Sequence, residues 1–303
     1  MAVEMRVLGS AAGGGFPQWN CGCTNCARAR LGQLAPRTQD SLSISANGQD
    51  WFLINASPDV ARQIEATRPL WPRAQRGSPI RGVVLTNGDL DHVLGLLQLR
   101  EGQPLSLYAT PEVRAGLEQN SMLRTLMRFD GQLVWRTLAL GEEQQLLGPR
   151  GERSDVFVRP FAAPGKPPLH LAAVAAPSAG DNVGLTLRGA SAAKAVYLSA
   201  TSAIAPVREQ LEGAAVLLLD GTFWSETELI DAKLGHASAR DMAHLPVGGE
   251  AGSVAQCASL EVGRKLLTHI NNTNPILDPS SAERAWLSAQ GWELAEDGLR
   301  LAF

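Results

Sequence analysis

The sequence lacks any excess of positive charge. Its 303 residues carry a formal net charge of −3, and no run is rich in lysine and arginine. Broad electrostatic attraction to nucleic acid or to anionic membranes is therefore not expected. The first residues include neither a basic nor an apolar stretch, so we expect no secretory signal. No run approaches the roughly 18 apolar residues that span a bilayer. Together these absences indicate a cytoplasmic protein without a membrane span.

Cysteine is scarce, yet three of the four cysteines, Cys21, Cys23 and Cys26, lie within six residues. Thiols this close would be strained as mutual disulfides, and a cytosol keeps them reduced. On a tight turn they would converge on one point, and Zn²⁺ prefers four sulfur or imidazole ligands in a tetrahedron. We therefore predict a small zinc-binding loop at about residues 20–27, with a redox or catalytic thiol cluster as the alternative. The candidates for the fourth ligand are Cys257, His236 and His244.

The predicted elements come in a mixed order. Early strands form a hairpin pair, the middle of the chain is rich in strand patterns that include residues 171–175, and helical patterns lie between some of the strands. This order favours sheets packed face to face with helices outside them. No internal repeat is present, and the Pro- and Gly-containing segments 68–79, 148–154 and 162–168 look like surface loops. We expect one domain, residues 1–303, of the α/β (α+β) class.

A polar segment, Asn87-Gly88-Asp89-Leu90-Asp91-His92, directly follows the apolar run at residues 82–86. The pattern predicts a strand that presents metal-binding side chains at its end and then turns into a helix. Its spacing is similar to the H-x-H-x-D-H signature of metallo-β-lactamase-fold hydrolases. Asn87 and Asp89 stand in the places of the first two histidines.

Two later strand patterns also end in a metal-binding residue. Asp220 follows the run at 215–219, and His269 follows the run at 264–268. A lone Asp after a strand is often a turn or cap residue, and a lone His there is more often structural. The coincidence of three such strand ends in one chain favours a metal site.

Five segments of the chain, in order, resemble the coenzyme PQQ synthesis protein B family. The most specific are the Trp19-Asn20-Cys21-Gly22-Cys23 run and the His269-Ile270-Asn271-Asn272-Thr273-Asn274-Pro275 run. The five segments are residues 9–21, 55–59, 86–95, 220–224 and 269–275.

The resemblance implies a metallo-β-lactamase-like αββα sandwich with two mixed β-sheets and helices on the outer faces. It also implies a role in making pyrroloquinoline quinone (PQQ), a redox cofactor built from a Glu and a Tyr of a precursor peptide. The implied reaction is Fe(II)- and O₂-dependent hydroxylation of the tyrosyl ring of the cross-linked Glu–Tyr precursor. The implied partners are this small-molecule precursor, O₂ and other enzymes of the pathway. One alternative is a carrier that transports the quinone or its precursor toward the periplasm.

The superfamily uses two metal sites, and this chain matches the family's ligands at one of them. Asn87 and Asp89 replace the histidines of the first site, which is degraded. The resemblance assigns Asp91, His92, Asp220 and His269 to the second, where they also serve as the catalytic residues. Two imidazoles with carboxylates and open positions are the ligand set of non-haem Fe(II) oxygenases. We expect Fe²⁺ in function, although Zn²⁺, Mn²⁺ or Mg²⁺ can occupy such a site. The loss of the first site argues against a further alternative, a metal-dependent hydrolase that clamps hydroxide between two ions.

The remaining expectations concern residues around these sites. Asp89 is expected to ligate the metal or to orient His92. The segment 240–246 is similar to one of the family and implies that His244 completes the cysteine site as the fourth zinc ligand, although Ala243 stands in place of the family's glycine. The candidates for substrate binding are Asn271, Asn272, Ser57 and Asp59. For the last two the alternative is a helix N-cap and a first-turn carboxylate.

Overall fold

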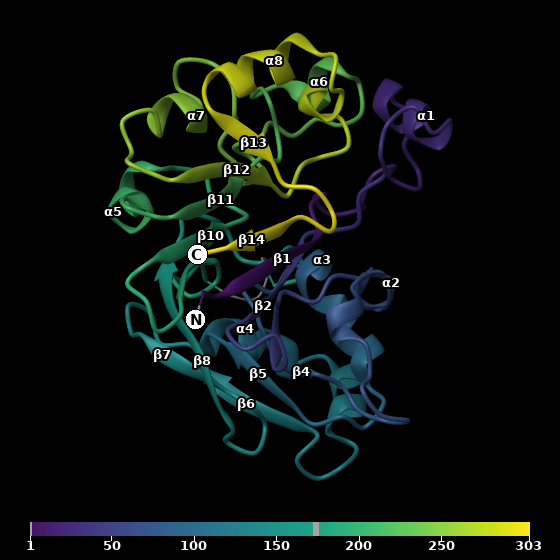
Figure 1. Ribbon diagram of the computed structural model, residues 1–303. Helices are drawn as coiled ribbons and strands as arrows, with labels where there is room; N and C mark the ends of the chain where they lie inside the picture. Colours follow the sequence, from purple (N-terminus) through teal and green to yellow (C-terminus); the bar gives the residue numbers. More distant parts are fainter. Residues whose placement is uncertain (1, 172–175) are drawn as a thin grey trace.

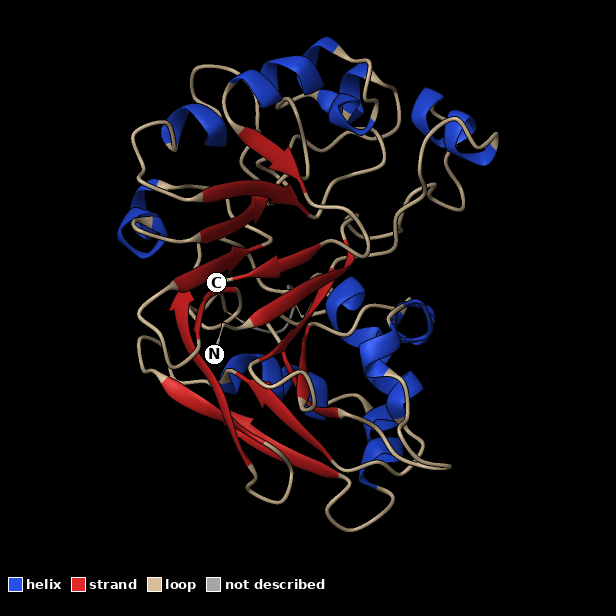
Figure 2. Cartoon of the chain, viewed as in Figure 1, coloured by secondary structure: helices blue, strands red, loops and turns tan. Residues whose placement is uncertain are grey.

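Two seven-stranded sheets, seen in the computed structural model, pack face to face with helices on their outer sides (Figures 1 and 2). The structure describes residues 2–171 and 176–303, so most of the strand expected at residues 171–175 lies outside the described residues. The N-terminal sheet has the order β14-β1-β2-β3-β4-β5-β6, and the C-terminal sheet has the order β13-β12-β11-β10-β9-β8-β7. The expected αββα sandwich is therefore confirmed.

The strands of the N-terminal sheet are β1 (Glu4–Gly9), β2 (Ser41–Ser45), β3 (Trp51–Ile54), β4 (Ile80–Val84), β5 (Leu105–Ala109), β6 (Leu133–Thr137) and β14 (Arg300–Ala302). Those of the C-terminal sheet are β7 (Gln144–Leu147), β8 (Arg153–Ala162), β9 (Val183–Arg188), β10 (Lys194–Leu198), β11 (Val216–Asp220), β12 (Arg264–Thr268) and β13 (Trp292–Leu294). Both sheets are mixed, because β3 to β6 and β10 to β13 pair in parallel while the other neighbours pair antiparallel.

The helices are short. The α-helices are α1 (Thr24–Arg30), α2 (Val60–Ala66), α3 (Leu90–Val93), α4 (Pro111–Glu118), α5 (Arg208–Leu211), α6 (Glu228–Asp231), α7 (Ser253–Gln256) and α8 (Ala282–Ala289). The 3-10 helices are η1 (Arg68–Leu70), η2 (Leu94–Leu99), η3 (Ser121–Met127), η4 (Ala205–Val207) and η5 (Pro275–Leu277). No helix in the described part of the chain has the length and apolar character needed to cross a membrane.

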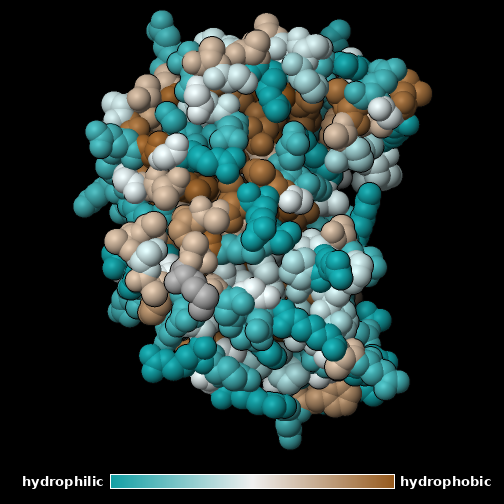
Figure 3. Space-filling model, in the orientation of Figure 1, coloured by the Kyte–Doolittle hydropathy of each residue, from teal (hydrophilic) through white to brown (hydrophobic). Residues whose placement is uncertain are grey.

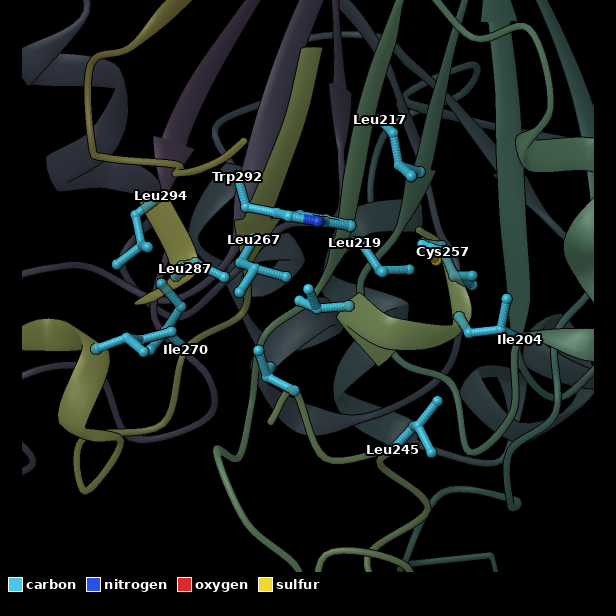
Figure 4. Close-up of a cluster of buried hydrophobic side chains, with 14 of the residues drawn as sticks. Ile204, Leu217, Leu219, Leu245, Cys257, Leu267, Ile270, Leu287, Trp292 and Leu294 are labelled. Carbon is cyan, nitrogen blue, oxygen red and sulfur yellow. The ribbon is translucent and has the colours of Figure 1, made fainter. Parts of the chain in front are cut away.

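Alternation along the strands sends side chains to two different hydrophobic layers. On β11, Val216 and Leu218 pack in the core between the sheets, whereas Leu217 and Leu219 pack under the outer helices. This is the period of two that a strand imposes on its side chains. Figure 4 shows the outer layer of the C-terminal sheet, where Leu287 lies beside Ile270 and Cys257 lies near Leu219. Hydrophilic residues cover most of the face in Figure 3, and the hydrophobic residues that show lie mainly in its upper half.

Candidate metal centre

The three polar strand ends predicted from the sequence meet at one edge of the sandwich. Asn87 lies shortly after β4 of the N-terminal sheet, Asp220 is the last residue of β11, and His269 directly follows β12 of the C-terminal sheet. The two sheets are joined here because Val183 N donates to Thr86 O at 2.9 Å, and Asn87 forms a bridge with Asn182. Ligands from both sheets therefore face the same space.

Asp91, His92 and His269 each offer a ligand atom within 4.8 Å of the others. Asp91 Oδ2 lies 3.2 Å from His269 Nε2 and 3.8 Å from His92 Nε2. His92 Nδ1 donates to Asn87 Oδ1 at 2.7 Å, which leaves the lone pair on Nε2. That Nε2 atom is buried and has no hydrogen-bond partner among residues 2–171 and 176–303. A buried imidazole nitrogen without a partner, beside a carboxylate and a second imidazole, fits a metal ion.

Asp220 and His244 form a second group with His269. His244 Nδ1 donates to Asp220 Oδ2 at 2.7 Å. The other oxygen of Asp220 accepts from Thr222 Oγ1 at 2.7 Å, and Thr222 Oγ1 also lies 2.8 Å from His269 Nδ1. These bonds fix the orientation of both imidazoles beside the Asp91–His92 pair.

The prediction that His244 is a zinc ligand with the cysteines is wrong, because its side chain reaches Asp220 instead. Ala243, which replaces the family's glycine, adopts the left-handed conformation with φ 65. Glycine normally favours this conformation. The turn therefore survives the substitution, and it directs His244 into the metal centre.

Burial and neighbouring carboxylates set the charges of the centre. Burial lowers the pKa of His92 to about 4, against the opposing charge of Asp91, so this imidazole is neutral. Burial also acts to lower the pKa of His269, but the hydrogen bond and charge of Asp91 outweigh it and raise this pKa to about 9. Burial and the charge of Asp91 raise the pKa of Asp89 to about 6. A metal ion would displace the proton of His269, so its binding would release protons.

The sulfur atoms of Cys21, Cys23 and Cys26 lie within 4.8 Å of one another. The amide of Asn272 faces all three, with Nδ2 at 3.1, 3.6 and 3.4 Å from the Sγ atoms in that order. The nitrogen and oxygen of a side-chain amide exchange places by a simple flip. Asn272 therefore occupies the fourth side of the cluster, where His244 was expected, and the prediction that Asn272 contacts substrate is wrong.

Ser57 and Asp59 were also predicted to contact substrate, and the structure contradicts this too. Neither lines the cavity described below. Ser57 Oγ accepts from Asp59 N at 3.2 Å, and Asp59 Oδ2 accepts from Gln39 N at 3.0 Å. The alternative, with Ser57 as a helix N-cap and Asp59 as a first-turn carboxylate, is not seen either, because α2 begins at Val60 and its N-cap is Asp59, whose side chain makes no capping hydrogen bond.

A cavity of about 470 Å³ opens over the metal-binding side chains, a size that suits a small-molecule ligand. Asn271 lines it, as the sequence predicted. Lys166, Phe223 and Met242 also line it and were missed. Phe223 comes three residues after Asp220, so the strand end that pointed to Asp220 could also have pointed to Phe223. Lys166 lies in segment 162–168, which looked like a surface loop. The lining also includes Asp89, Asp91, His92, His244 and His269.

Glu228 of α6 supports the loop that carries Asn271. It accepts hydrogen bonds from Thr273 Oγ1 and, at 2.6 Å, from Trp224 N. Burial raises the pKa of Glu228 from 4.5 to about 7. The folded state therefore holds a proton that the unfolded state loses, and stability falls as the pH rises from about 4.5 to about 7.

We expect the Glu228→Gln variant to be more stable than the unchanged protein above pH 7, by about 1–3 kcal/mol. The difference should shrink as the pH falls below about 4.5, where Glu228 becomes protonated in both the folded and the unfolded state. Urea unfolding at several pH values measures it. The exposed Glu250, changed to Gln, is the control and should show no such pH-dependent gain. Equal effects of the two variants would contradict this account of Glu228.

Comparison with known proteins identifies full-length relatives. A family model described as a β-lactamase superfamily domain matches residues 50–270. The chain is 44% identical to coenzyme PQQ synthesis protein B of Rhodopseudomonas palustris, over 98% of each protein. It is 41% identical to the protein of the same name from Bradyrhizobium diazoefficiens, over 99% of each.

A solved structure agrees with these relatives. It is described as Zn²⁺-bound PqqB from Methylobacterium extorquens, is 40% identical to this chain, and superposes with a TM-score of 0.91. The match covers 98% of this chain and 99% of the other. Both the sequence and the fold are therefore shared over nearly their whole length.

Proposed function

The chain belongs to the coenzyme PQQ synthesis protein B family, with the metallo-β-lactamase fold, and takes part in PQQ biosynthesis. Within that role, we propose that it is an Fe(II)- and O₂-dependent hydroxylase. Its substrate is the tyrosyl ring of the cross-linked Glu–Tyr precursor, and the reaction takes place in the cytoplasm. One oxygen atom enters the ring, the other leaves as water, and an external donor supplies two electrons.

The observation that carries this proposal is the Asp91–His92–His269 group, with its unpartnered His92 Nε2, at the base of a cavity. Two imidazoles and one carboxylate with open positions are the ligands of non-haem Fe(II) oxygenases. When bound there, Fe(II) would supply the activation of O₂. Every other contribution comes from the side chains around the cavity.

The two-metal hydrolase alternative finds less support, because Asn87, which replaces a histidine of the first site, and Asn182, which pairs with it, both have other partners. Asn87 Oδ1 accepts from His92 Nδ1 at 2.7 Å, so it orients a ligand. Asn182 donates through Nδ2 to Ala200 O at 2.9 Å. The side-chain amides of Asn87 and Asn182 are therefore hydrogen-bonded parts of the cavity wall. A carrier would use the same cavity but would bind the quinone without turnover.

His244 is well placed to accept the proton that hydroxylation displaces from the ring. Asp220 accepts from its Nδ1, which leaves a lone pair on Nε2, and His244 lines the cavity. An imidazole oriented by a buried carboxylate is a common general base. Asn271, also on the wall, offers an amide to the phenol oxygen or the amino-acid groups of the substrate.

The cysteine cluster has a separate role in this proposal. Cys21, Cys23 and Cys26 would hold a structural Zn²⁺. The side-chain amide of Asn272, which faces the three sulfurs, would supply the fourth ligand through its oxygen after a flip. Asn272 lies three residues after His269, so this site also fixes the loop that follows a ligand of the metal centre. Asn25 reinforces the same contact, because its Nδ2 donates to Asn274 O at 3.0 Å.

Among the described residues that line the cavity, Lys166 alone is a lysine or an arginine. Its Nζ donates to Asp241 O at 3.1 Å at the rim, and its charge acts to lower the pKa of Asp89. We expect the Lys166→Met variant to raise KM for the carboxylate-rich precursor about tenfold, since a charge-assisted hydrogen bond of this kind contributes about 1.5–3 kcal/mol. The value of kcat should change little, because this proposal assigns Lys166 to the carboxylates of the precursor and not to the reacting ring.

Steady-state kinetics with two further variants complete this test. Lys166→Arg keeps the charge and should keep most of the affinity. Lys233, an exposed lysine outside the cavity lining, changed to Met, should leave KM unchanged. If Lys166→Met binds the precursor as tightly as the unchanged protein, Lys166 is not its carboxylate partner.

Oxygen uptake tests the hydroxylase itself. The Fe(II)-loaded protein, given the cross-linked diamino acid and a two-electron reductant, should consume O₂ and form a hydroxylated product. The Zn²⁺-loaded protein should do neither. Anaerobic turnover by the Zn²⁺ form would instead support the hydrolase.

A further inference from the structure

A chain of buried hydrogen bonds runs beneath the metal centre and begins beside His269. Thr268 Oγ1, one residue before that ligand, donates to Asp40 Oδ1 at 2.6 Å. The other oxygen of Asp40 accepts from Tyr197 Oη. Asn55 Nδ2 in turn donates to Tyr197 Oη at 3.2 Å. Each of Asp40, Asn55, Tyr197 and Thr268 has 0% of its surface exposed.

The same chain continues to the other imidazole ligand. Asn55 Oδ1 accepts from Thr86 N at 3.0 Å and from Thr86 Oγ1 at 3.1 Å. Thr86 Oγ1 lies 3.4 Å from His92 Nδ1, which also donates to Asn87. A path of hydrogen-bonded polar groups therefore runs through the interior from His92 to Thr268, the residue before His269.

The path crosses from one sheet to the other. Asn55 and Thr86 follow β3 and β4 of the N-terminal sheet, whereas Tyr197 is on β10 and Thr268 on β12 of the C-terminal sheet. His92 is carried by the first sheet and His269 by the second. Their separation therefore depends on how the two sheets are held at this edge.

Two residues in or next to this hydrogen-bonded path have an unfavourable backbone conformation. Asn55 has φ 60 and His269 has φ 55, in the left-handed region that costs most residues free energy. Asn55 is fixed by its bonds to Tyr197 and Thr86, and the residue before His269 is fixed by Asp40. Hydrogen bonds in a dry interior reinforce one another, so the loss of one member weakens the rest.

We propose that Tyr197 and Asp40 are positioning residues that set the separation and orientation of His92 and His269, and thereby the affinity and geometry of the metal centre. Neither touches the metal or the substrate. The inference rests on the proposed metal centre, and it assigns a role to two fully buried polar groups that the reaction itself does not use.

The chain provides a matched control, because it has two tyrosines and both are buried. Tyr108 has 1% of its surface exposed, and its Oη donates to Leu147 O at 3.1 Å and accepts from Leu147 N at 2.6 Å. It lies on β5, and its hydroxyl belongs to none of the bonds described above. Tyr197→Phe and Tyr108→Phe therefore remove the same atom from similar surroundings, with and without the connection to the ligands.

The test is a Co²⁺ titration of the full-length protein with Zn²⁺ already filling the cysteine cluster, followed by visible absorption. Tyr197→Phe should weaken Co²⁺ binding about 10–100-fold, as losses of groups that orient metal ligands do, and should shift the absorption bands. Tyr108→Phe should keep the Kd and the spectrum of the unchanged protein, even where the two variants lose similar thermal stability. Thr268→Val gives the same test if Tyr197→Phe does not fold, and Thr268→Ser should restore binding.

The outcomes separate this inference from the proposed function. An unchanged Kd and spectrum in both Tyr197→Phe and Thr268→Val would overturn the positioning role. Equal losses of affinity in the two tyrosine variants would also overturn it, by making the effect one of general stability. Failure of the unchanged protein to bind Co²⁺ at Asp91, His92 and His269 would overturn the proposed metal centre itself.

Discussion

The His92→Gln variant is expected to lose the metal ion of the centre and to lower turnover of the precursor by about a thousandfold or more. The magnitude follows because a catalytic metal contributes several kcal/mol to the transition state. His92 is 1% exposed, and its Nε2 has no hydrogen-bond partner in the described part of the chain. Burial lowers its pKa to about 4, so the imidazole is already neutral and ready to bind a cation.

The measurement is the iron content of the centre together with oxygen uptake. Glutamine keeps a polar group of similar length, so the fold should survive and the loss should be specific. His236, which is exposed and belongs to none of the ligand groups, changed to Ala, is the control and should keep full activity. Unchanged iron content in His92→Gln would mean that the ion binds elsewhere.

The Cys26→Ser variant is expected to lose one Zn²⁺ per chain and to destabilise the fold by several kcal/mol. Cys26 is 0% exposed, and its Sγ lies 3.4 Å from the amide of Asn272. Structural zinc contributes its binding free energy directly to folding. Removal of one of three thiolates should therefore empty the site, and chelators should destabilise the unchanged protein in the same way.

Two further variants show which residue completes the cysteine site. Asn272→Ala should weaken Zn²⁺ retention, whereas His244→Ala should keep this zinc and lower turnover instead. Cys257→Ala is the control for loss of a buried thiol, because burial raises the pKa of Cys257 to about 12 and keeps it an unreactive member of the core. Loss of the structural zinc in His244→Ala would contradict the assignment of His244 to the metal centre.

The sequence predicts the residues of the metal centre better than it predicts the residues that surround this centre and the cysteine cluster. Asp220 and His269 were found because one ends and the other directly follows an apolar strand, and Asp91 and His92 because they belong to the polar segment that comes after β4. The ends of strands in a sandwich meet at shared edges. The direction of the long loop before β12 is not encoded in such a pattern. The resemblance of segment 240–246 to the family assigned His244 to the cysteine cluster, whereas its turn brings it to Asp220.

Other residues could not be placed because their partners are distant in the chain. Asn272 and Asn271 are adjacent, yet one faces the cysteines and the other the cavity. Lys166 reaches the cavity from a loop with no strand or helix pattern. The Tyr197–Asp40 pair is 157 residues apart in sequence, and only the packing of the two sheets brings it together. The sandwich itself follows from the alternating strands, whereas the order of the strands in each sheet does not.

The most direct test of the hydroxylase is the origin of the oxygen in the product. The Fe(II)-loaded protein is incubated with the cross-linked Glu–Tyr diamino acid and a reductant under ¹⁸O₂ in ordinary water, and the product is analysed by mass spectrometry. We predict a hydroxylated ring that carries ¹⁸O, and no product from the His92→Gln variant. A product that carries oxygen from water, or one that forms equally well without O₂, would contradict the oxygenase.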